Sequence, residues 1–283
     1  MASVIFRGRR VKVQIGTLLI ETPATGDGLN VEIDVVRTLD RLPNTATVKI
    51  YNMTEMHRRQ CEALTGDDRI ALEIGYVTTG LFEIFRGEVR LAQTARQDAD
   101  LVTTIEAADG HKAINARINR SYARGTKLSV VLRDLQQLSG MGPGNLDEML
   151  AREPRLANAK LETGITLRGE AGKLIQEALG PQGFTGSVQA GVMQVTGTGG
   201  LPATAVLLKP GTGLLGSPSL ALDQDGKTRI LSAEARPQPG LEPGRQVRVE
   251  AESVTGTFVV QRSQYAGSVN GEQWTAAIEA RPY

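Results

Sequence analysis

The sequence predicts a mainly β protein with a smaller α+β insertion in its middle. Three observations carry this prediction. Apolar and polar residues alternate with period two near both ends of the chain, glycine is abundant at 32 residues, and aromatic residues make up only 4%. Alternation of this kind is typical of strands with one buried face, and abundant glycine suits many turns. The central part of the chain instead places apolar residues at helical spacing.

Residues 1–109 are predicted to form one antiparallel β unit with a single helix. The helix is expected from about Glu55 to Leu64, with Asn52 or Thr54 as its N-cap and Gly66 near its end. Alternating residues predict strands at 11–15, 29–35, 46–50, 70–76, 81–91 and 101–107. The unit is expected to close at Asp109 and Gly110.

Residues 110–200 are predicted to form a small α/β middle region, and residues 201–283 a second β unit. The middle region shows helices at 128–138, stopped by Gly140, and at 171–179, then a hairpin through 184–195. In the last part, strand patterns occur at 205–208, 229–235, 247–249, 258–260 and 275–280, with a tight turn at Asp225-Gly226 among others. The order leaves room for two related β domains around an insertion.

Composition excludes several classes of protein. Lys and Arg number 32 against 31 Asp and Glu, so the chain lacks the excess positive charge of a DNA-coating protein. Cys61 is the only cysteine, which excludes an intrachain disulfide and fits folding in a cytoplasm. Neither a signal-peptide core nor a run of about 20 apolar residues is present, so we expect no membrane span.

One stretch is clearly basic. Between Gly110 and Lys127 there is no Asp or Glu, and five residues are cationic: Lys112, Arg117, Arg120, Arg124 and Lys127. Such a run commonly forms a solvated face. The alternative is a surface that binds an acidic partner, and these five residues are the candidate partner-binding site.

The motifs that suggest chemistry each fail a requirement. Residues 211–216 match the dinucleotide pattern G-x-G-x-x-G, but Ser217-Pro218 stands where a helix must open. Residues 223–226 resemble the start of a calcium loop, but Gly226 comes too early. His57 and Cys61 lie one helical turn apart without a third orienting group, which favours a buried cysteine over a nucleophile. We therefore expect no catalytic, cofactor or metal site.

An ordered series of short segments resembles the baseplate hub proteins of contractile-tailed bacteriophages. Each segment is brief and rich in turns, but together they span both ends of the chain. They are residues 29–34, 43–54, 74–76, 85–87 and 109–110, then 213–218, 241–247 and 272–275. The middle region matches this family only in outline.

The resemblance implies two tail-tube-like antiparallel β-barrel or sandwich domains around the middle region, assembled as a homotrimer. It further implies a trimeric ring that joins a hexameric tail tube, or a tube-initiator protein, to a trimeric spike protein. Baseplate wedge or sheath-initiator proteins would bind outside, and the tape-measure protein and DNA would pass through the lumen without specific binding. The protein would be made in the host cytoplasm and reside in the virion baseplate.

Other functions stay open at this point. A tail-associated peptidoglycan hydrolase would need paired carboxylates, whose spacing is spatial and not visible in a sequence. A glycan-binding module would favour exposed aromatic residues, which are few here. The same hub could also serve a contractile bacteriocin, an injection system, a gene-transfer particle or a flexible-tailed phage.

Overall fold

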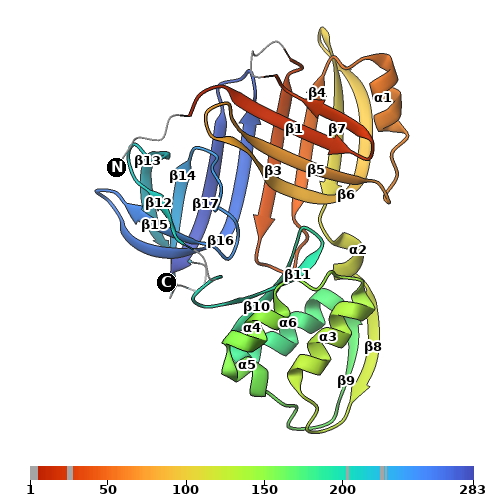
Figure 1. Ribbon diagram of the computed structural model, residues 1–283, viewed down its shortest axis with the longest axis vertical. Helices are drawn as coiled ribbons and strands as arrows, with labels where there is room; N and C mark the ends of the chain where they lie inside the picture. Colours follow the sequence, from red (N-terminus) through yellow and green to blue (C-terminus); the bar gives the residue numbers. More distant parts are fainter. Residues whose placement is uncertain (1–5, 24–27, 202–203, 224–225, 227) are drawn as a thin grey trace. The chain divides into compact units, whose positions relative to one another are not determined.

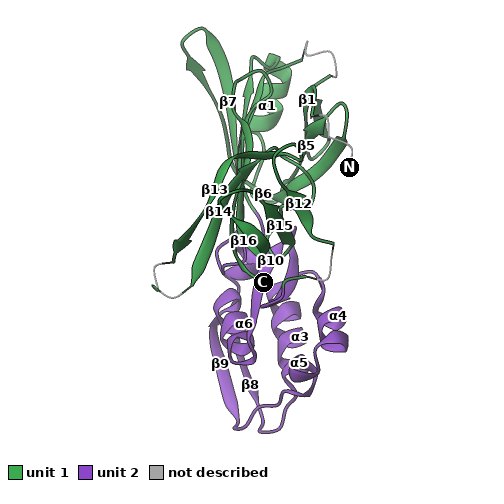
Figure 2. Ribbon diagram, turned by 90° about the vertical axis from the view of Figure 1, so that its left-hand side faces the viewer, with its two compact units in different colours: residues 1–37, 45–108, 200–283 green, residues 38–44, 109–199 purple. Residues whose placement is uncertain are grey.

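A computed structural model describes residues 6–23, 28–201, 204–223, 226 and 228–283 (Figure 1). The chain divides into two compact units, which Figure 2 colours separately. Unit 1 comprises residues 1–37, 45–108 and 200–283, and unit 2 comprises residues 38–44 and 109–199. The first and last parts of the chain therefore belong to one unit. The division into 1–109, 110–200 and 201–283 stays a prediction.

The first half of unit 1 contains the strands that alternation predicts, together with one short strand, β2, that it did not. The strands are β1 (Arg9–Ile15), β2 (Leu18–Glu21), β3 (Val31–Thr38), β4 (Thr45–Tyr51), β5 (Arg69–Tyr76), β6 (Gly80–Gln97) and β7 (Asp100–Ala108). Helix α1 (Glu55–Glu62) lies between β4 and β5 and ends two residues before the predicted Leu64. Its N-cap is Thr54, whose hydroxyl accepts a hydrogen bond from the His57 backbone amide at 3.4 Å.

The second half of unit 1 is also built from strands. They are β12 (Val206–Leu208), β13 (Leu214–Leu222), β14 (Arg229–Ala235), β15 (Gln246–Glu250), β16 (Thr255–Ser268) and β17 (Trp274–Pro282). Residues after the glycine-rich 211–216 segment continue as strand β13, so no helix opens there, as the Ser-Pro sequence predicted. The predicted turn at Asp225-Gly226 includes a residue outside the described part of the chain.

The two halves of unit 1 repeat the same strand order. The first half runs β3-β4-β7-β6-β5-β1 and the second runs β13-β14-β17-β16-β15-β12. The long strands β6 and β16 also bulge at the same place, directly after Val89 and directly after Val260. One difference lies at the end, where β1 pairs antiparallel with β5 but β12 pairs parallel with β15. Unit 1 is therefore a structural repeat within one chain.

Each half folds into a sandwich because its long strand belongs to two layers. Strand β6 pairs with β5 through residues 80–88 and with β7 through residues 88–97. Strand β16 likewise pairs with β15 through its first residues and with β17 further on. Inward-facing side chains of both halves form one continuous core, including Val13, Val48 and Val260, each fully buried. The predicted mainly β fold with an α+β insertion is confirmed.

The two halves meet where β16 lies beside β3 in one sheet, which has 13 strands in the described part of the chain. A second contact reinforces this junction. The Arg9 guanidinium on β1 donates to the carbonyl oxygens of Ser268 at 2.8 Å and Glu272 at 2.9 Å, and also to that of Gly271. It lies over the ring of Trp274, 5.7 Å from the ring centre. Arg9 thus fastens the first half to the β16–β17 turn of the second.

Unit 2 has its own apolar core and a mixture of helices and short strands. Its elements are α2 (His111–Ile114), β8 (Arg117–Tyr122), α3 (Leu128–Ser139), α4 (Leu146–Arg152), α5 (Pro154–Asn158), β9 (Ile165–Glu170), α6 (Ala171–Leu179), the 3-10 turn η1 (Gly180–Gln182), β10 (Phe184–Gln189) and β11 (Val192–Gly197). Helices α3 and α6 occur where apolar spacing predicts them, and Gly140 ends α3 with φ 78°. Helices α2, α4 and α5 were not predicted, because four to seven residues are too few to show helical periodicity.

A buried polar network holds the chain segments that connect unit 2 to the sheet strands. The Asp109 carboxylate accepts hydrogen bonds from the backbone amides of Ala190 at 2.6 Å and Gly191 at 2.7 Å. Asn44 donates to the same carboxylate at 3.2 Å, and the Gln189 amide donates to the Thr38 carbonyl at 2.8 Å. Segment 38–44, which joins β3 to β4, is thereby part of unit 2 and not of the sheet. Asp109, at the predicted Asp109-Gly110 boundary, therefore has a structural role, because its carboxylate holds these segments together.

We expect Arg9→Ala to lower the free energy of unfolding by about 1–3 kcal/mol, because hydrogen bonds from a charged donor to carbonyl groups are lost. Urea unfolding would measure the change. The neighbouring Arg10→Ala is the control, since Arg10 is also partly exposed but makes one ion pair, with Glu21, and pairs with partly exposed partners contribute about 1 kcal/mol or less. Equal losses for the two variants would show that the carbonyl contacts of Arg9 add no stability.

Candidate partner-binding surfaces

The basic stretch is exposed on unit 2 but does not form one patch. Lys112 lies on α2, Arg117 and Arg120 on β8, and Arg124 and Lys127 on the loop that leads into α3. All five are exposed. Strand alternation separates the two β8 residues, because Arg120 shares the face of β8 that α3 covers while Arg117 points to the other side.

Two members of the stretch have an acidic neighbour. Arg117 of β8 stands in register with Glu170 of β9. The Arg120 Nε atom lies 3.9 Å from a carboxylate oxygen of Asp134 on α3. This pair is exposed to solvent and of little energetic weight. The remaining members of the candidate site stay on the surface of unit 2.

Two further cations join this surface that sequence reasoning missed. Lys160 forms an isolated antiparallel bridge with Lys127, and Arg168 lies on β9 opposite Asn119 of β8. Both come from segments more than 30 residues further along the chain, so a window around residues 110–127 cannot include them. The available signal was the alternation of Ile165 and Leu167, which marks β9 as a strand able to pair with β8.

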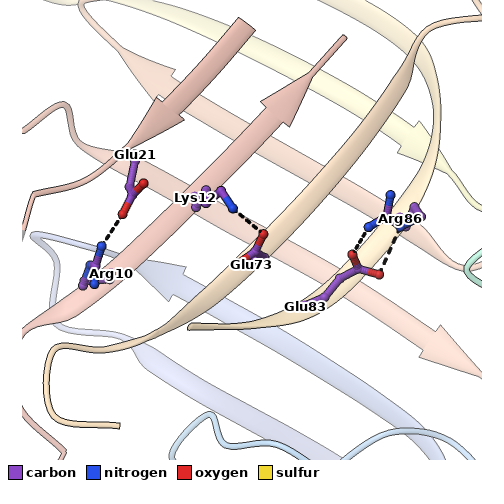
Figure 3. Close-up of polar contacts among 6 residues, drawn as sticks. All are labelled: Arg10, Lys12, Glu21, Glu73, Glu83 and Arg86. Atoms are coloured by element: carbon purple, nitrogen blue, oxygen red, sulfur yellow. Dashed lines mark hydrogen bonds and ion pairs between the residues drawn. The ribbon is translucent and has the colours of Figure 1, made fainter. Parts of the chain in front are cut away.

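On unit 1, the outer face of β1, β2, β5 and β6 carries a row of compensated charges (Figure 3). Glu73 and Glu83 stand directly opposite each other on β5 and β6, an arrangement of like charges that is unfavourable by itself. The Lys12 ammonium lies 2.7 Å from Glu73, and the Arg86 Nε atom donates to Glu83 at 3.2 Å. The hydrogen bond to Glu73 raises the pKa of Lys12. Each carboxylate is thus held by a cation, which suits a solvated structural face.

The outer face across β3, β4 and the second half of unit 1 carries polar and charged side chains. Ion pairs compensate its charges, with Lys49 3.3 Å from Glu32 and Arg262 3.1 Å from Glu279. A shallow hollow of about 370 Å³ lies on this face over β13, β14, β16 and β17. Serines 217, 219 and 232 line it together with charged residues and with Leu215, Ala233, Ala277 and Ile278, so its lining is mixed and not mainly apolar as in a typical small-molecule pocket.

Several strand edges of unit 1 are open in the described part of the chain, among them the end strands β2 and β12 and two edges on β6 and β13. Beyond its bulge, β6 pairs with β7 on one side and with no described strand on the other. Strand β13 stands at the end of the sheet and pairs only with β14. Apolar side chains are exposed at both edges, with Leu91 43% exposed on β6 and Leu222 62% exposed on β13. Open edges of this kind can pair with another strand.

The residues singled out for chemistry lie in positions that do not support it. Cys61 is fully buried in the unit 1 core, and burial raises the pKa of its thiol to about 11, which disfavours the thiolate that a nucleophile requires. Among the described residues, no group of three His, Cys, Asp or Glu side chains is arranged to hold a metal ion. None of the described helices has the length and apolar character needed to cross a membrane.

No protein family model matches the sequence, and no curated protein is significantly similar to it. The fold, in contrast, has clear relatives. A 43 kDa tail protein of prophage MuSo2 from Shewanella oneidensis aligns over 96% of both chains with a TM-score of 0.67 at 10% identity. A tail protein from Neisseria meningitidis MC58 aligns over 97% of this chain and 96% of its own, with a TM-score of 0.64 at 10% identity.

A third relative belongs to a secretion machine. The Escherichia coli c3393 protein is described as a component of the type VI secretion system with structural similarity to the T4 bacteriophage tail proteins gp27 and gp5. It covers 96% of this chain and 77% of its own, with a TM-score of 0.62 at 11% identity. The chain therefore has the fold shared by these phage tail and type VI secretion proteins, and the resemblance noted in the sequence is confirmed at the level of the fold.

We expect the Cys61 thiol to stay unreactive toward a thiol reagent at pH 8 until the chain unfolds. The raised pKa of Cys61 also makes the free energy of unfolding depend on pH. Because the folded thiol ionises near pH 11 and the unfolded thiol near 9.0, stability is unaffected below about pH 9 and falls as the pH rises toward 11. Urea unfolding of the wild type and of Cys61→Ala across this range would measure the difference. An unchanged difference between pH 8 and pH 10.5 would contradict the shifted pKa.

Proposed function

We propose that the chain is the structural hub of a phage tail baseplate, a homotrimeric ring that joins a hexameric tail tube to a trimeric spike. The observation that carries this proposal is the repeat within unit 1. Two sandwiches with the same strand order stand in one chain, while unit 2 is inserted only once.

Symmetry explains why such a chain suits an adaptor. Three copies in a ring supply six similar sandwiches to a sixfold partner, and three copies of unit 2 to a threefold partner. Unit 2 is inserted between β3 and β4 and again after β7, which all lie at one end of those neighbouring antiparallel strands.

The outer face of the second half supports a role in letting other molecules pass. Around its hollow, hydroxyl side chains stand beside the Arg262–Glu279 ion pair, so this cation is already compensated and is not free to hold a phosphate. In our proposal the tape-measure protein and then DNA move through the ring without being held. The mechanism is positional and not enzymatic, and the protein resides in the virion tail.

The proposed ring would also bind proteins other than the tube and the spike. Wedge or sheath-initiator proteins bind its outside, and the exposed basic side chains of unit 2 contact an acidic surface on one of these proteins or on the spike. The similarity to the type VI secretion protein c3393 favours one second candidate, a hub in a contractile bacteriocin or injection system. The ring that we propose would suit either machine.

Purified chain at high concentration is expected to form threefold rings with a central hole and six peripheral lobes in negative-stain images. Mass measurement on the same sample is expected to give three chains per particle. Adding the tube and spike proteins from the same gene cluster should yield a ternary complex. A chain that stays monomeric and binds neither protein would overturn the proposal, and turnover on peptidoglycan would replace it with the hydrolase.

Charge reversal on unit 2 tests the basic surface. Changing Arg117, Arg120 and Arg124 to Glu is expected to weaken binding to the acidic partner about tenfold or more. Thermal stability is expected to fall only slightly, because the new carboxylates beside Glu170 and Asp134 are exposed to solvent. Reversal of Arg133, Arg152 and Arg155, three exposed arginines elsewhere on unit 2, is the matched control. Equal assembly and infectivity of both variants would assign the basic stretch to a solvated face.

A further inference from the structure

The junction inside unit 1 joins two sandwiches that have the same strand order. At this junction β16, beyond its bulge, lies beside β3. The Gln264 side-chain amide donates to the Asp34 carboxylate at 2.8 Å, and the Ser268 hydroxyl lies 2.7 Å from the Asn30 side-chain oxygen. The Val269 backbone amide donates to the Val31 carbonyl at 3.0 Å. A strand of one sandwich thus continues the sheet of the other.

The repeat identifies the positions that correspond to this junction elsewhere in unit 1. In both long strands a bulge follows a valine, so Leu91 and Gln93 of β6 correspond to Arg262 and Gln264 of β16. Following the register across the next strands, Thr47 corresponds to Ser232, because Glu106 and Glu279 occupy the same place on β7 and β17. Asp34 opposite Thr47 then corresponds to Ser219 opposite Ser232.

Both corresponding edges are open among the residues that the structure describes. There, strand β6 beyond its bulge has β7 on one side only, and β13 has β14 on one side only. In each half, one edge belongs to the long strand, β6 or β16, and the other to the first strand of the order, β3 or β13. Within one chain the edges of β16 and β3 are joined, which leaves those of β6 and β13. The remaining two are complementary in kind and belong to opposite ends of unit 1.

Side chains at the open edges are those of an unfinished interface. Leu220 corresponds to Val35, which is fully buried at the internal junction, yet Leu220 is 38% exposed. Strand β13 carries no charged residue over Leu214–Leu222, although charge is the usual protection of a solvent-facing edge. Pro218 lacks an N–H group, so a ladder along this edge is limited to the residues that follow it.

We propose that the β6 edge of one copy, residues 91–97, pairs antiparallel with the β13 edge of the next copy, residues 219–222, with Gln93 beside Ser219. The partner is a second copy of this chain, and the proposal deepens the ring of the proposed function on which it rests. The contact is head to tail, so it generates a closed ring or an open filament and not an isolated dimer. The Gln93 amide and the Ser219 hydroxyl replace the amide and carboxylate of the internal junction.

Cysteine cross-linking tests the pairing in the full chain. A variant with Gln93→Cys and Ser219→Cys is treated with a short bifunctional thiol reagent and run on a denaturing gel. We expect covalent dimers and trimers, and no product when either substitution is present alone. Gln14→Cys with Ser219→Cys is the matched control, because Gln14 is equally exposed but lies on β1. The native Cys61 is buried and adds no background.

The outcomes separate this inference from the proposed function. Trimers by mass that do not cross-link through residues 93 and 219 would overturn the pairing and leave the ring. Cross-linked ladders longer than three chains would support the pairing and overturn threefold closure. Equal cross-linking of the Gln14 control, or an uncross-linked monomer at the highest concentration, would overturn the pairing.

A charge swap gives a second readout that does not depend on cysteine geometry. Gln93→Lys with Ser219→Lys is expected to weaken assembly about two- to fivefold at each interface, because like charges opposite each other on neighbouring strands are unfavourable. Gln93→Lys with Ser219→Glu is expected to restore it. Equal assembly of the two variants would contradict the predicted juxtaposition.

Discussion

The pairing of β16 with β3 is the constraint on which the architecture of unit 1 depends. Backbone N–H and C=O groups along a buried strand must find partners, and at this junction each half satisfies the other. The common core follows from this continuity, because side chains of both halves then face one interior. The Arg9 contacts with the β16–β17 turn add a polar fastening at the same boundary. Without the junction, two sandwiches would each expose a long strand edge.

Unit 2 depends on a different constraint, the burial of charge. Asp109 is 2% exposed, and a buried carboxylate is tolerated only when hydrogen bonds surround it. Two backbone amides and the Asn44 side chain supply those bonds. Because these donors come from the β3–β4 connection and from the β10–β11 turn, the network joins segments that are distant in the chain. A corner that looks like a simple Asp-Gly turn in the sequence is therefore a junction of three segments.

Period-two alternation was sufficient to predict most strands of unit 1, since each has one buried and one solvated face. It missed β13, where glycine, serine and Pro218 interrupt the pattern at an open edge. It also missed β9, and with it Lys160 and Arg168 as neighbours of the basic stretch, because proximity across a pair of strands depends on tertiary contacts. The repeat within unit 1 was anticipated only as two related β domains. Its register became visible through the bulges after Val89 and Val260, which leave no local mark in the sequence.

Tethering gives the internal junction a property that contacts between separate molecules lack. Both of its strands belong to one chain, so their encounter is unimolecular and does not depend on the protein concentration. Dilution therefore does not dissociate such a contact. Having two sandwiches in one polypeptide also allows corresponding positions to carry different residues, as Asp34 and Ser219 do. A duplicated domain can thus keep one edge permanently closed while its other edge evolves separately.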